Sequence, residues 1–90
     1  MALTQPAQVA GSLVKWLEEN PYDGRTRNVR HALNRLKAGG VEPMPASNGL
    51  DPQEAASRLL DMWRVLADMG DREGAWLLNL TVADLTEVEW

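Results

Sequence analysis

The sequence predicts an all-α fold, a small single-domain bundle of four to five helices with one long irregular connector at about residues 39–50. Its apolar residues are mainly Leu, Ala, Met, Val and Trp, with no Phe and no Ile. Leu, Ala and Met favour helix over strand. Apolar residues also recur at intervals of three and four along much of the chain, which indicates helices with one buried face. The predicted helices span residues 6–19, 26–38, 52–69, 72–79 and 82–89.

The best-defined helix lies between Asp51 and Gly70. Asp51 is the predicted N-cap, Pro52 suits the first helical position, and Glu54 lies three residues after the cap. Gly70 is the predicted C-cap residue. The apolar residues cover nearly half of the circumference of this helix, and a helix that faces one neighbour needs a stripe of roughly 100°. We therefore expect this helix to contact several elements.

The two N-terminal helices are amphipathic and end at turn-forming sequences. Thr26 is the predicted N-cap of the second helix, and Gly39 with Gly40 ends it. Gly11 lies in the first helix, which it weakens by about 1 kcal/mol relative to Ala. Because Gly11 falls on the polar side of that helix, the sequence shows no packing reason for a glycine there.

Residues 76–90 have two interpretations. In the first, Asp71 caps one helix, and Thr81 with Asp84 forms a capping box for a second, shorter helix. In the second, the segment is a strand, because apolar and polar residues alternate on either side of Thr81. We favour the two helices.

The composition fits one domain over residues 1–90, because chains of this length rarely form two cores. The absence of cysteine favours a reducing compartment. The first residues lack the basic and apolar regions of a signal peptide, and no apolar run approaches the roughly 20 residues of a membrane span. We therefore expect a cytoplasmic protein. Seven Arg against two Lys, with frequent Ala, hint at a bacterial or phage genome rich in G and C.

The residue types of common active sites are scarce. His31 is the only histidine and there is no cysteine, so zinc sites and Ser–His or Cys–His pairs lack their usual groups. The glycines form neither a P-loop nor a GxGxxG pattern, and the Asp residues are too scattered for an EF-hand. We expect that the protein is not an enzyme and uses no cofactor and no metal.

Charge is distributed unevenly, with a sum of +3 over residues 1–40 and −7 over residues 41–90. Five basic residues lie in the second helix or directly before it. They predict an alternative function, in which the protein is a small nucleic-acid-associated regulator that contacts phosphates. These residues are Arg25, Arg27, Arg30, Arg35 and Lys37. The acidic balance opposes this alternative, because nucleic-acid-binding domains are usually basic. The acidic segment suggests a further alternative, a phage-type inhibitor that mimics nucleic acid.

The function that we favour is a non-catalytic protein–protein interaction module, an adaptor or regulator. Its partner is another protein or a second copy of the chain, and the opposite charges of the two segments favour self-association. Met62, Val65 and Met69 lie at one edge of the apolar arc of the central helix, and Met suits adaptable contacts. Trp90 is a further contact candidate, because Trp is enriched among interface hot spots. Alternatively, the C-terminal segment covers this edge inside the domain.

Overall fold

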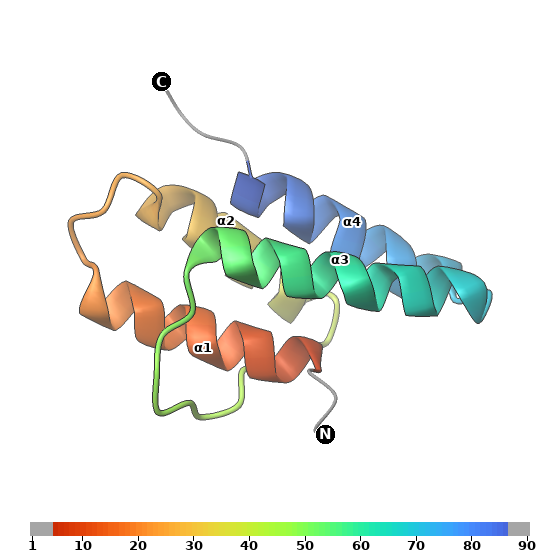
Figure 1. The fold of residues 1–90 in the computed structure, drawn as a ribbon, viewed down its shortest axis with the longest axis horizontal. Helices are drawn as coiled ribbons and strands as arrows, with labels where there is room; N and C mark the ends of the chain where they lie inside the picture. Colours follow the sequence, from red (N-terminus) through yellow and green to blue (C-terminus); the bar gives the residue numbers. More distant parts are fainter. Residues whose placement is uncertain (1–4, 87–90) are drawn as a thin grey trace.

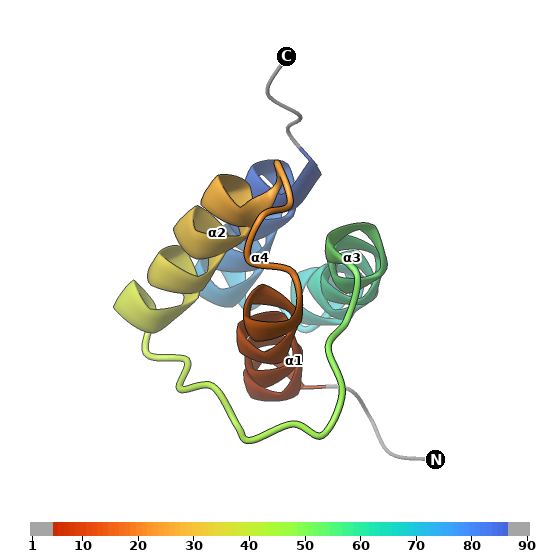
Figure 2. The same cartoon turned by 90° about the vertical axis from the view of Figure 1, so that its left-hand side faces the viewer.

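The computed structural model describes residues 5–86, and these form a bundle of four α-helices (Figures 1 and 2). The helices are α1 (Pro6–Glu19), α2 (Thr26–Ala38), α3 (Pro52–Asp68) and α4 (Arg72–Thr86). Helices α3 and α4 form an antiparallel hairpin, α2 packs against α4, and α1 packs against both α2 and α3. The prediction of an all-α bundle is confirmed, and no strand occurs in the described part of the chain.

Polar and glycine residues that the sequence singled out lie at the ends of the two helices of the hairpin. The Asp51 carboxylate accepts a hydrogen bond from the backbone N–H of Gln53 at 3.0 Å, so Asp51 caps α3. Gly70 has φ of +82°, which a glycine adopts without strain, and the next N–H, that of Asp71, donates to Leu66 at 2.9 Å. The Asp71 carboxylate then accepts from the N–H of Gly74 at 2.9 Å, which caps α4. The predicted caps Asp51 and Asp71 are confirmed, whereas the C-cap residue of α3 is Met69 and Gly70 follows it as the residue with positive φ.

The N-cap of α2 differs from the prediction. Thr26 is the first residue of the helix rather than its cap, and the N-cap residue is Arg25, whose side chain makes no capping bond. The Asp23 carboxylate accepts a hydrogen bond from the N–H of Arg25 at 2.9 Å, and the backbone carbonyl of Asp23 accepts from Thr26 at 3.1 Å. The turn residue Asp23 therefore takes the acceptor role that Thr26 was expected to fill.

The C-terminal segment forms one helix, α4, so the division into helices 72–79 and 82–89 is wrong over the described residues, as is the strand alternative. Thr81 is fully buried in the middle of α4, and its hydroxyl donates to the backbone carbonyl of Leu77 at 2.8 Å. The hydroxyl is thus satisfied inside the helix and caps nothing, which is a common arrangement for Thr within helices. Leu78 and Leu85 continue the buried face on either side of it.

Each helix contributes a leucine to the centre of the core, where Leu13, Leu36, Leu59 and Leu78 are almost completely buried. Trp16 is buried beside them. The core thus lies where all four helices meet.

Residues 39–51 join α2 to α3 by passing along the side of α1 that faces away from α4 (Figure 2). The N–H of Met44 donates to the carbonyl of Ala7 at 3.0 Å, and the N–H of Leu50 donates to that of Ser12 at 3.2 Å. Gly11 is buried between these two contacts, and a Cβ added to it would lie 1.6 Å from the carbonyl oxygen of Met44. Gly11 therefore has a packing role that its place on the polar side of the helix did not reveal, because this segment packs directly on it.

Candidate functional site

The environment of α3 changes halfway along the helix. Its buried residues, Pro52, Ala55, Ala56 and Leu59, all lie in the first half. Figure 1 shows the reason, since the α3–α4 hairpin extends well beyond the ends of α1 and α2. We call residues 60–76 the hairpin end. Within it, Met62, Trp63 and Leu66 still pack against the core, whereas other apolar side chains are exposed.

One edge of α3 in the hairpin end carries the predicted contact residues Met62, Val65 and Met69, which we call the methionine edge. Met62 is half-buried and packs against the core. Val65 and Met69 are 58% and 74% exposed. Within residues 5–86, no other segment covers these two side chains, although a domain of this size usually buries such residues. The structure therefore leaves two of the three predicted residues accessible together.

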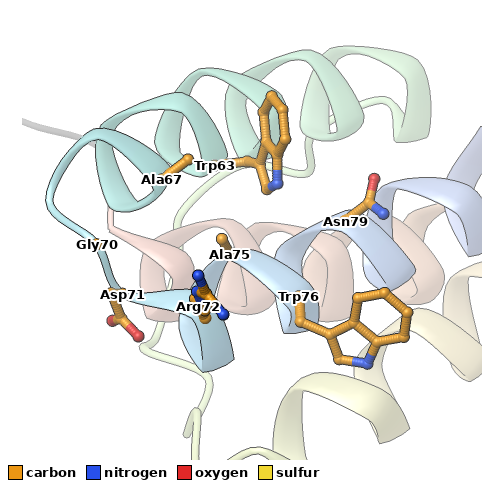
Figure 3. A pocket seen from close by; sticks show the side chains of 8 residues that line it. All are labelled: Trp63, Ala67, Gly70, Asp71, Arg72, Ala75, Trp76 and Asn79. Atoms are coloured by element: carbon orange, nitrogen blue, oxygen red, sulfur yellow. The ribbon is translucent and has the colours of Figure 1, made fainter.

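The opposite edge of α3 faces α4 across an open apolar groove of about 340 Å³, which we call the tryptophan groove. Figure 3 shows Trp63 of α3 and Trp76 of α4 on this face, with Ala75 between the two helices. The groove is also lined by Ala67, Gly70 and Asn79. Trp63 packs partly on the core, whereas Trp76 is 65% exposed.

The tryptophan groove was not predicted from the sequence. Trp76 lies on the outer face of α4, about 160° around the helix axis from the buried Leu78 when successive residues turn by 100°. Trp76 and Leu78 both lie in the predicted helix 72–79, so the sequence contained the signal that they face opposite ways. The sequence did not show which of the two faces is buried, and the structure places Leu78 in the core.

Among the five basic residues proposed for nucleic-acid contact, Arg25 and Arg35 form ion pairs with other described residues of the domain. Arg25 pairs with the carboxylates of Asp23 and Asp51, each at 3.1 Å, and its guanidinium lies 5.4 Å from the centre of the Trp16 ring. Hydrogen bonds from the side chain and backbone of Arg25 lower the pKa of Asp23. These contacts join the start of α2 to the start of α3.

Arg35, the second of these residues, joins α2 to α4. Its Nε donates to the Asp84 carboxylate at 2.6 Å, and this hydrogen bond raises the pKa of Arg35. The other three proposed basic residues, Arg27, Arg30 and Lys37, are exposed on α2. The basic surface available on α2 is thus smaller than the sequence implied, because Arg25 and Arg35 pair with carboxylates of the same domain.

The remaining predicted contact residue, Trp90, lies outside the described residues. Between residues 5 and 86, no group of three or more His, Cys, Asp or Glu side chains is arranged to hold a metal ion. No helix in the same range is long and apolar enough to cross a membrane. Comparison with protein-family models, with curated proteins and with solved structures finds no match to this chain.

Proposed function

We propose that the protein is a non-catalytic interaction module, an adaptor or regulator that binds a protein partner through the hairpin end. One observation carries the proposal: Val65 and Met69 are each more than half exposed, one turn apart on the same edge of α3, and Trp76 of α4 is 65% exposed. Exposed apolar side chains that lie together on a small protein commonly mark an interaction site. The absence of cysteine favours action in the cytoplasm.

The chemistry of the exposed residues supports a protein partner. An aromatic side chain can bury up to about 250 Å², so the exposed part of Trp76 offers about 160 Å² to a partner. At about 25 cal/mol per Å², its burial would contribute roughly 4 kcal/mol before the costs of association. Met69 adds a flexible apolar side chain that adapts to the shape of a partner. This free energy is gained only when a partner covers these side chains.

The experiment is an affinity pull-down with mass spectrometry that compares the wild-type chain with the double variant Val65→Asp, Met69→Asp. Both residues are exposed, so the variant should fold, and circular dichroism would verify this. The matched control is Gln53→Asp with Ser57→Asp, which adds the same charge at exposed positions of the same helix. We expect the wild type and the control to recover the same partner, which the hairpin variant loses.

The proposal would be refuted if all three proteins recovered the same set of partners. It would also be refuted if the wild type recovered none and was itself monomeric. Met62 is left unchanged in this design because it packs against the core, and an Asp there would test folding rather than binding.

The alternative of nucleic-acid binding rests on the exposed Arg27, Arg30 and Lys37 of α2. Charge reversal at Arg30 and Lys37 would abolish such binding, and its affinity would fall steeply with salt. An electrophoretic shift that persists in this variant would exclude the basic face as the site.

A further inference from the structure

We propose that the tryptophan groove is a self-association surface, on which a second copy of this chain packs hairpin against hairpin about a two-fold axis. Trp76 of each copy would lie in the groove of the other, and the two hairpins would form a four-helix interface. This inference rests on the proposed function, because it names the partner for one side of the hairpin end.

The shape of the surface is self-complementary. Trp76 projects from α4 and is 65% exposed, while the neighbouring floor of the groove is built from the small residues Ala67, Gly70 and Ala75 (Figure 3). A two-fold interface places the same patch on both partners, so each projection must find a hollow on an identical surface. This patch carries both a bulky projecting side chain and a shallow hollow beside it.

The charges around the groove are balanced, as self-association requires. Asp71 and Arg72 line the groove, one of each sign. The residues that line the groove therefore carry no net charge, whereas residues 41–90 sum to −7. A patch that faces its own copy repels itself if it carries a large net charge.

The positions of the basic residues strengthen this argument. Residues 41–90 contain only three basic side chains, and one of them, Arg72, lines the tryptophan groove. Another, Arg58, pairs with Glu54 at 3.5 Å, one turn earlier in α3. A surface that binds a strongly basic partner would be expected to carry a net negative charge instead. The balanced rim on an acidic segment therefore fits a second copy better than a charged partner.

The test is sedimentation velocity of the purified full chain from micromolar to millimolar concentration. The wild type should dimerise, and Trp76→Ser should raise the dimer dissociation constant at least about thirtyfold, the loss expected for truncating a hot-spot Trp. Tyr22→Ser is the matched control, because Tyr22 is an aromatic residue that is 97% exposed on the turn between α1 and α2. We expect that control to dimerise as the wild type does.

A second measurement locates the interface, using the absence of native cysteine. Asn79→Cys places one thiol in the groove, and Asn34→Cys places one on the exposed face of α2. A short bismaleimide should link the groove variant into a dimer and leave the α2 variant monomeric. Adding Trp76→Ser to the groove variant should suppress the link.

Three results would overturn self-association: a wild type that stays monomeric, equal dimerisation of the Trp76 and Tyr22 variants, or equal cross-linking at Asn79 and Asn34. A monomeric chain that still recovers a different protein, and loses it in the Val65, Met69 double variant, would overturn this inference alone. The proposed function would then stand, with another partner.

Discussion

Replacement of Gly11 by Ala tests the packing of the α2–α3 connecting segment on α1. A Cβ at this position would lie 1.6 Å from the carbonyl oxygen and 2.7 Å from the carbonyl carbon of Met44. These are backbone atoms, and the N–H of the same residue is bonded to Ala7 at 3.0 Å. No side-chain rotation relieves the overlap, so the segment itself must move away from α1.

Two opposing effects decide the sign of the change in stability. Gly→Ala inside a helix gains about 1 kcal/mol from helix propensity. Forcing an extra carbon into a packed site costs about 1–3 kcal/mol. Loss of the Met44–Ala7 hydrogen bond costs about 1 kcal/mol more. The expected result is a net loss of about 1–3 kcal/mol, or roughly 5–20 °C in Tm for a domain of this size.

Thermal and urea unfolding followed by circular dichroism would measure this loss. Gly24→Ala is the matched control, because Gly24 is exposed and a Cβ there would meet no atom within 4 Å. We expect the control to change the free energy of unfolding by less than about 0.5 kcal/mol. A Gly11→Ala variant as stable as the wild type, or more stable, would refute the reasoning, since helix propensity alone would then determine the outcome.

Two further predictions concern the core and the response to acid. Leu59→Ala should cost about 2–5 kcal/mol in urea unfolding because Leu59 is fully buried, whereas Leu60→Ala should cost less than about 1 kcal/mol; equal losses would contradict the placement of α3. The hydrogen bonds from Arg25 lower the pKa of Asp23 from its usual value of 3.8. The ionised Asp23 carboxylate therefore stabilises the folded state above about pH 4, and this stabilisation is lost as the pH falls through the pKa of the folded state. Asp23→Asn should therefore flatten the fall of Tm between about pH 4 and pH 2, and parallel curves for both proteins would exclude this pair as a source of acid sensitivity.

The sequence alone determined where most helices lie and how the hairpin turns. Apolar spacing and the polar residues Asp51 and Asp71 act within a few positions along the chain, so local physics placed the bounds of α1 and α2 and the start of α3 correctly. The positive φ of Gly70 was predictable for the same reason. Helix-capping residues and the spacing of apolar residues are properties of neighbouring positions in the chain, so they can be recognised without knowledge of any tertiary contact.

Only the tertiary structure decided which residues are covered. Gly11 is required by the backbone of Met44, which is remote in the sequence, and burial of Thr81 made one helix of a segment whose pattern suggested a break. The exposure of Val65 and Met69 has the same origin. Both lie on the apolar arc of α3, and burial of that arc depends on how far α1 and α2 reach along the hairpin. Trp76 is exposed for another reason, because it lies on the outer face of α4. Periodicity reports which face of a helix is apolar, whereas the relative lengths and positions of its neighbours determine how much of that face is left for a partner.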